Sequence, residues 1–282
     1  MHSIDKARPY RFQLSLYWII SLYIMTCVFS LEANPLDKVP IISYEYPPYT
    51  SDSLEGGGMR TKIATAAYKA LNVDTSVNLL PTIRAQTQFI TSPSLVYMGI
   101  LTHFSKHDQK TLIFVPLMPI RLAIFYYSPA YPSVIDFQRT EDLQPYSVGT
   151  MLGSVTAKHL RKAHVEVQEQ SNLEGLLKKL HARRIDFAAM TDLFGIQTSA
   201  KLFPNESHNF KQLPKPLMEA WIGLMFHKSD AQAQTRARKF KQGMKQIIED
   251  GTYLKIISSY YHQETVPKNI LDFINETSLT SR

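Results

Sequence analysis

Residues 146–162 read YSVGTMLGSVTAKHLRK, and they predict a strand, a tight turn and a helix in direct succession. The strand is expected over Tyr146–Thr150, the turn at Gly153-Ser154, and the helix over Val155–Lys162. The alternation continues with a strand at Val165–Gln168, a helix striped by Leu173, Leu176, Leu177 and Leu180, and a buried strand at Ile185–Met190. Strands that alternate with helices in this way favour a mainly parallel sheet with helices on both faces.

The residues on either side of this unit continue the same rhythm. Strands are expected at Val39–Ser43, Val77–Leu80, Leu95–Leu101 and Leu122–Tyr127, with helices at Met59–Asn72 and Thr82–Ile90. A linker-like stretch, residues 136–145, separates the two units. After a further strand at Trp221–Phe226, two amphipathic helices on either side of Asp250-Gly251 close the pattern. The sequence therefore predicts two similar α/β units with closing helices.

The composition excludes several classes of protein. The 282 residues are 44% hydrophobic, which is too apolar for a disordered chain and sufficient for one large domain or two ordinary ones. The formal net charge is +7, but the basic residues of 236–245 alternate with Phe240 and Met244, which predicts the solvated face of a helix and no nucleic-acid partner. A single cysteine, Cys27, excludes a disulfide scaffold, a cysteine-rich zinc module and an iron–sulfur protein.

Residues 1–30 are predicted to be a secretory signal peptide. Three basic residues (Lys6, Arg8 and Arg11) precede an almost uncharged apolar run over Leu14–Leu31, and small residues at Val28 and Ser30, or at Ala33, provide cleavage sites. The run also reaches the lower length limit for an uncleaved membrane anchor. Both interpretations predict an exported protein, with a periplasmic location.

Four segments, in order along the chain, carry a family pattern. They are Tyr46-Pro47-Pro48-Tyr49 before a glycine turn, residues 148–154 (VGTMLGS), residues 184–192 (RIDFAAMTD), and Ile248-Glu249-Asp250-Gly251-Thr252 with Tyr260-Tyr261. Their order and spacing resemble the extracellular solute-binding proteins of family 3, the periplasmic receptors of polar amino-acid ABC importers. The resemblance extends over Val39–Tyr261, nearly the whole mature chain.

That resemblance implies a type II periplasmic-binding-protein fold, with two α/β lobes of mixed sheet and flanking helices around a ligand cleft. The first lobe would comprise residues 39–124 plus 223–261, the second lobe residues 125–222, and residues 262–282 would form a C-terminal tail. The resemblance further implies a monomer without a cofactor. This monomer would close around a small polar ligand, amino-acid-like or related, and present it to a membrane transporter permease or a sensor protein.

The sequence departs from the family pattern at the ligand carboxylate. Amino-acid receptors of this family place an arginine about six residues before a Phe-x-x-Pro segment, and Asp108 occupies that spacing before Phe114-Val115-Pro116. A carboxylate cannot replace the two-pronged hydrogen bonding of a guanidinium. Residues 81–85 (PTIRA) instead resemble the P-x-x-R-A of a divergent branch, which weakens the expectation of ordinary amino-acid capture.

Five residues are candidates for ligand contact. Tyr46 and Tyr49 flank a stiff diproline, which presents aromatic rings at low entropic cost for stacking or cation–π contact. Ser154 begins a helix, where it is either an anion ligand or an ordinary N-cap. The resemblance implies that Asp192, at the end of a strand, pairs with a ligand ammonium, although a helix cap explains it equally well. Arg84 lies early in a helix, as an anion ligand or as a solvated side chain.

Two other functions stay open at this point. The loss of the family arginine favours a ligand-free signalling module that docks on a membrane partner. Related dehydratases use the same fold, so an exported enzyme with Asp192 and Asp108 as acid–base groups is a third hypothesis, which the absence of hydrolase and phosphate-loop motifs disfavours. His103 and His107 have the helical spacing of metal ligands, but no third ligand accompanies them, so no metal site is expected.

Overall fold

The computed structural model describes residues 38–131, 136–261 and 266–279. The predicted signal peptide and its cleavage sites lie outside the described residues. Among the helices of the described part, none is long and apolar enough to cross a membrane.

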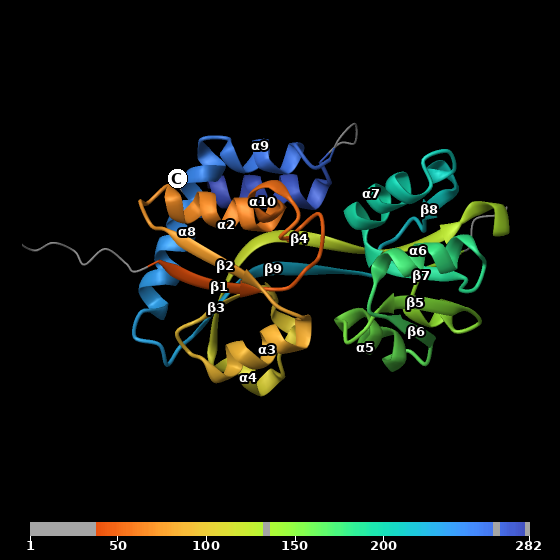
Figure 1. Ribbon diagram of the computed structural model, residues 1–282, viewed down its shortest axis with the longest axis horizontal. Coiled ribbons are helices and arrows are strands. Elements are labelled where there is room, and N and C mark those ends of the chain that lie inside the picture. The colour runs from red at the N-terminus through yellow and green to blue at the C-terminus, as the bar shows by residue number, and fades with distance from the viewer. Residues whose placement is uncertain (1–37, 132–135, 262–265, 280–282) are drawn as a thin grey trace, which may run out of the picture. The chain divides into compact units, whose positions relative to one another are not determined.

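In the part of the chain that the structure describes, nine strands form one mixed sheet in the order β2-β1-β3-β9-β4-β7-β5-β6, with β8 paired to β4 (Figure 1). The strands are β1 (Val39–Ser43), β2 (Thr75–Leu79), β3 (Val96–Ile100), β4 (Leu112–Tyr127), β5 (Ser147–Met151), β6 (Glu166–Gln170), β7 (Phe187–Thr191), β8 (Phe210–Gln212) and β9 (Met218–His227). Strands β1, β2 and β3 are mutually parallel, as are β5, β6 and β7. Two parallel units therefore stand at opposite ends of the strand order, as the strand–helix alternation predicted.

Nine α-helices of the described residues flank this sheet. They are α2 (Met59–Lys69), α3 (Thr82–Thr91), α4 (Lys106–Lys110), α5 (Val155–Lys162), α6 (Leu173–His181), α7 (Asp192–Leu202), α8 (Ala233–Glu249), α9 (Thr252–Ser258) and α10 (Lys268–Leu279). The first lobe contains β1–β3 with α2–α4 and α8–α10, and the second lobe contains β5–β8 with α5–α7 (Figure 1).

The two longest strands, β4 and β9, run through both lobes and are antiparallel to each other. Their ladder extends from the pair Leu112–His227 to the pair Leu122–Met218. Strand β9 also pairs with β3, and β4 pairs with β7, both antiparallel. The expectation of a mainly parallel sheet is therefore wrong for these central strands. Each of them passes from one lobe to the other, and the two run in opposite directions.

Strand β4 begins ten residues earlier than the strand predicted over Leu122–Tyr127. Pro116 and Pro119 obscure the earlier part, since proline lacks the N–H that a central strand donates. The structure accommodates both prolines because β4 pairs only with β9 over that part, and because the register shifts between Pro116 and Met118.

In the second lobe, apolar residues cover both faces of the sheet. Leu176, Leu177 and Leu180 of α6 pack on one face, and Leu160 of α5 packs on the other. The stretch 136–145, expected to be a linker, instead contributes to this core: Phe137 is 5% exposed and Leu143 is fully buried.

In the first lobe, α2 crosses α8 at Gly243. A Cβ atom on Gly243 would lie 1.8 Å from the carbonyl oxygen of Ala67, so only glycine permits this backbone approach. Arg236 of α8 is also buried, and it pairs with Asp230 at 3.1 Å. The solvated face predicted for the basic residues of α8 is therefore wrong at Arg236, although Arg238 and Lys241 are exposed.

Helix α10 lies within residues 262–282, which the sequence predicts to be a C-terminal tail. Ile270 is 1% exposed, and the ring of Phe273 lies 5.3 Å from Trp221 of β9 and 5.9 Å from Tyr253 of α9. The helix thus extends the apolar packing of the first lobe.

Candidate functional site

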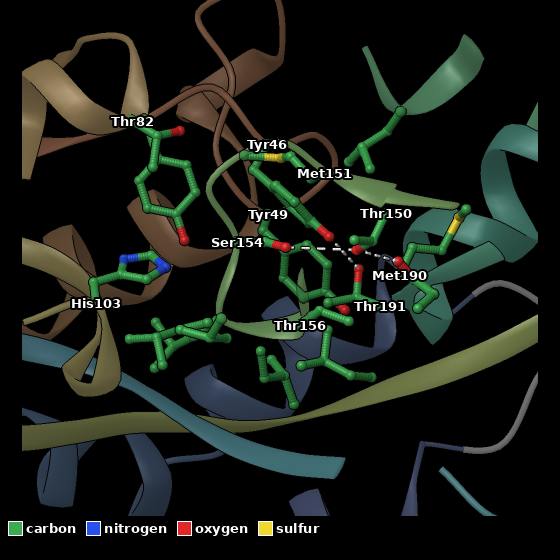
Figure 2. A pocket seen from close by; sticks show the side chains of 18 of the residues that line it. Tyr46, Tyr49, Thr82, His103, Thr150, Met151, Ser154, Thr156, Met190 and Thr191 are labelled. Carbon is green, nitrogen blue, oxygen red and sulfur yellow. Dashed lines mark hydrogen bonds between the residues drawn. The ribbon is translucent and has the colours of Figure 1, made fainter. Parts of the chain in front are cut away.

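A cavity lies between the two lobes, on the crossing strands (Figure 2). Its volume is about 560 Å³ when the open solvent at its mouth is counted, and nineteen of the described residues form its wall. The first lobe and the crossing strands contribute Tyr44, Tyr46, Tyr49, Arg60, Thr82, Ile100, His103, Ile120, Leu122 and Ile222. The second lobe contributes Thr150, Met151, Ser154, Val155, Thr156, Leu173, Ala189, Met190 and Thr191. A wider cleft, whose volume of about 2260 Å³ includes open solvent, shares Tyr46, Thr82, Met151 and Leu173 with it.

The loop that carries the tyrosines is closed by its own backbone. The Tyr46 N–H donates to the Thr50 carbonyl at 2.8 Å, and the Thr50 N–H donates back to Tyr46 at 3.0 Å. The Pro47–Pro48 peptide within it is cis. This loop then receives the start of α2, because the N–H groups of Met59 and Arg60 donate to the carbonyls of Pro48 (3.0 Å) and Tyr49 (2.8 Å).

This docking of α2 determines where Arg60 lies. Side chains on a helix point back toward its N-terminus, so a residue in the first turn faces the segment that precedes the helix. Here that segment is the tyrosine loop. The guanidinium carbon of Arg60 lies 5.3 Å, 5.7 Å and 5.3 Å from the ring centres of Tyr44, Tyr46 and Tyr49. We refer to Arg60 with these three tyrosines as the Arg60 cage.

The cation in the Arg60 cage lacks a counter-ion among the described residues. Arg60 is 1% exposed, and its Nε and Nη1 atoms are buried without a hydrogen-bond partner. The Tyr49 hydroxyl is likewise buried without a partner. Burying an unpaired charge costs several kcal/mol, and cation–π contacts recover about 0.5–2 kcal/mol each. The cage therefore has unused capacity for an anion.

The hydroxyls of Tyr46 and Tyr49 stay protonated at any physiological pH. Burial raises the pKa of Tyr46, and burial together with the neighbouring Tyr261 and Asp192 raises the pKa of Tyr49 well above its usual value. Both hydroxyls can therefore donate a hydrogen bond to an anion beside the guanidinium.

The opposite wall comes from the end of β5 and the start of α5. Ser154 caps α5, since its hydroxyl accepts from the Ala157 N–H at 3.1 Å, and it also lines the cavity. Thr150 donates to the Ala189 carbonyl at 3.0 Å, and Thr191 donates to the Tyr46 hydroxyl at 3.3 Å (Figure 2). The last of these bonds joins the second lobe to the first.

No protein-family model and no curated protein matches this sequence. Solved structures do match. The GluR0 ligand-binding core from Nostoc punctiforme, in complex with L-glutamate, is 15% identical with a TM-score of 0.62 over 79% of this chain and 99% of its own. The substrate-binding protein of an amino acid ABC transporter is 16% identical with a TM-score of 0.61 over 80% and 99%. A histidine kinase sensor domain with similarity to periplasmic binding proteins is 17% identical with a TM-score of 0.65 over 80% and 96%.

The chain has the two-lobe fold of periplasmic binding proteins. At these sequence identities the similarity shows the fold alone. The residues that line the cavity must therefore be read from this sequence. The cavity lies beside the crossing strands β4 and β9, and both lobes supply residues to its wall.

Three of the five residues predicted for ligand contact line the cavity: Tyr46, Tyr49 and Ser154. Arg84 is not part of the wall and is exposed on α3. Asp192 is not part of the wall either; its Oδ1 atom accepts from the Leu193 N–H at 2.7 Å, as expected for a residue at a helix start.

Arg60 was missed at the level of sequence. A basic residue in the first turn of a helix opposes the helix dipole, which is a recognisable signal of a special role. Tyr44, Tyr46 and Tyr49 lie sixteen, fourteen and eleven positions before Arg60. The periodicity of α2 identifies its core face but not the loop against which its first turn packs.

The remaining titratable residue of the wall is His103. Burial, with the positive charges of Arg60 and Lys158, lowers the pKa of His103 to about 4, so the ring is neutral at pH 7. Its Nδ1 atom lies 2.9 Å from the Tyr97 hydroxyl. Within the described residues there is no cluster of three metal-ligating side chains, around His103 and His107 or elsewhere.

Proposed function

We propose that this protein is a solute-binding component of a membrane transport or sensing system and that it takes a small organic anion into the cavity at Arg60. The single observation that carries the proposal is a fully buried guanidinium whose Nε and Nη1 atoms lack partners, in the wall of an interlobe cavity. Buried charges in proteins are ordinarily paired, so a buried guanidinium with unpartnered nitrogens in a cavity wall fits a site for an anionic ligand.

The distribution of the wall over two lobes supports binding by closure. Arg60 and the tyrosines come from the first lobe, whereas Ser154 and Thr156 come from the second. A ligand that contacts both lobes binds the closed form more tightly and shifts the population toward it. The closed form would then be the signal that a permease or a sensor recognises, as the resemblance to periplasmic receptors implies.

The proposal can be tested by thermal unfolding of protein that has been denatured and refolded to remove carried-over solutes. We expect small carboxylates to raise the Tm, and sugars and polyamines to leave it unchanged. The Arg60→Met variant should lose the carboxylate response. Arg238→Met, which removes an exposed arginine of α8, should keep it. If no carboxylate raises the Tm of the parent protein, the proposal is wrong.

A second function is favoured by one observation, the contacts that already join the lobes. Thr191 donates to the Tyr46 hydroxyl at 3.3 Å, the ring centres of Tyr46 and Phe194 lie 5.9 Å apart, and Gln197 donates to the Tyr260 carbonyl at 2.6 Å. A protein held closed without a ligand could dock on a membrane partner as a ligand-free module. The thermal-unfolding experiment separates the two functions, because the module predicts no response to any solute.

The exported enzyme has no comparable support in this cavity. Asp192 and Asp108, its proposed acid–base pair, are both absent from the wall. Asp108 lies in the first turn of α4 and accepts from the Ser105 hydroxyl at 2.6 Å.

A further inference from the structure

The charges around the cavity restrict the class of ligand. Among the described residues that line the cavity, Arg60 is the only one that carries a charge at pH 7, because none of them is an aspartate or a glutamate and His103 is neutral. An α-amino acid would bring an ammonium group next to this arginine. No carboxylate of the wall would pair with it, and the faces of the three tyrosines are already turned to Arg60.

One cation also limits the number of anionic groups. A single guanidinium can hold one carboxylate through two parallel hydrogen bonds. A second carboxylate on the same ligand would be buried without a partner. Its desolvation penalty would exceed its Coulomb attraction to the distant Arg60. The wall therefore suits a ligand with one negative charge.

Among the described residues that line the cavity, the buried polar side-chain atoms without a hydrogen-bond partner belong to Arg60 and Tyr49. The unpartnered Tyr49 hydroxyl lies with Arg60 in the cage, whereas the hydroxyls of Thr150 and Thr191 are already engaged as donors. The rest of the wall includes six aliphatic side chains: Ile100, Ile120, Leu122, Val155, Leu173 and Ile222. A ligand that matches this division has an anionic head and a short apolar tail.

We propose that the ligand is a small monocarboxylate with an aliphatic tail and without an ammonium group. This inference rests on the proposed function, which requires only that some organic anion binds. It goes further by excluding zwitterionic amino acids and dicarboxylates as the preferred solutes, although the solved structures of the same fold include receptors for amino acids.

Matched pairs of compounds test the head group. Isothermal titration calorimetry on stripped protein would compare 4-methylpentanoate with leucine and 3-methylbutanoate with valine, since each pair differs by one ammonium group. Pentanoate would be compared with glutarate, which adds a second carboxylate. We expect each monocarboxylate to bind at least tenfold more tightly than its amino acid or dicarboxylate. Equal or tighter binding of leucine, valine or glutarate overturns the inference and leaves the proposed function intact.

A chain-length series tests the tail. From acetate to pentanoate, burial of each added methylene should increase affinity about fourfold, until the cavity is filled. An affinity that stays flat over the series overturns the aliphatic tail. If no compound of any class binds, and Arg60→Met changes nothing, the proposed function itself fails. The two failures are therefore distinct.

Discussion

The guanidinium carbon of Arg60 lies 5.3 Å from the ring centre of Tyr49, and the backbone N–H of Arg60 donates to the Tyr49 carbonyl at 2.8 Å. Tyr49 thus holds the backbone of the arginine and covers its side chain. Because both contacts come from a loop closed by its own hydrogen bonds, the cation is positioned before any ligand arrives. Preorganisation of this kind reduces the entropic cost of binding.

Removing the buried charge should stabilise the ligand-free protein. Arg60→Met has a similar volume and eliminates the desolvation penalty, which exceeds the gain from three cation–π contacts. We expect the free energy of unfolding to rise by about 1 kcal/mol or more. Denaturant titration of stripped protein measures this change, with Arg238→Met as the control. A large loss of stability would instead assign Arg60 a purely structural role.

A substitution at Gly58 should disrupt the loop that bears the cage. Gly58 has φ +88°, and a Cβ there would lie 2.8 Å from the Tyr49 carbonyl oxygen. We expect Gly58→Ala to destabilise the protein by about 1–3 kcal/mol and to weaken anion binding. The control is Gly175→Ala in α6, whose Cβ has no neighbour closer than 3.9 Å. It should stabilise by about 0.5–1 kcal/mol. If Gly58→Ala leaves the free energy of unfolding unchanged, the turn must shift to make room for the added methyl group.

A carboxylate introduced at Ser154 should compete with the ligand. Aspartate is as good an N-cap as serine, so Ser154→Asp should preserve α5 while it places a negative charge in the wall. We expect anion affinity to fall at least tenfold. Ser154→Ala should cost about 1 kcal/mol of stability from the lost cap and should affect affinity less. Calorimetry with 4-methylpentanoate measures both, and equal losses in the two variants would contradict the charge argument.

Asp192 should be dispensable for binding a ligand that lacks an ammonium group. Asp192→Asn removes the charge from the first residue of α7 and keeps a side-chain oxygen that can accept from the Leu193 N–H. We expect the affinity for a monocarboxylate to stay within about threefold. If the ligand carried a buried cation that pairs with Asp192, the same variant would weaken binding tenfold or more. The Kd of the variant therefore decides between the two ligand classes.

His103 should make stability depend on pH in the acid range. The pKa of His103 is about 4 in the folded protein, because of burial, Arg60 and Lys158, and about 6.5 in an unfolded chain. Below pH 6.5 the unfolded chain takes up a proton that the folded protein does not. The stability contributed by the neutral ring is therefore complete above pH 6.5 and is lost as the pH falls toward 4.

This loss should amount to about 1–3 kcal/mol between pH 7 and pH 4 for a half-buried ring. His103→Gln should reduce the slope of unfolding free energy against pH by that amount, relative to the parent protein. Carboxylates elsewhere contribute equally to both proteins, so the difference isolates His103. Parallel pH profiles would show that the ring does not titrate as described.

Local patterns were sufficient for the α/β units. Helix α5 has the predicted bounds, Val155–Lys162, because Ser154 caps its start and its leucine faces the core. Capping and periodicity act within a few residues, so they can be recognised in the chain itself.

Long-range packing decided the rest. The full extent of β4 depends on its pairing with β9, about a hundred residues away, which tolerates Pro116 and Pro119. The position of Arg60 depends on a loop that folds back onto the start of α2. The absence of Arg84 and Asp192 from the wall depends on how α3 and α7 pack against the rest of the fold. Burial is a property of several segments together. For this reason the chain alone indicated a binding fold, whereas the charge of its cavity emerged only when both lobes were assembled.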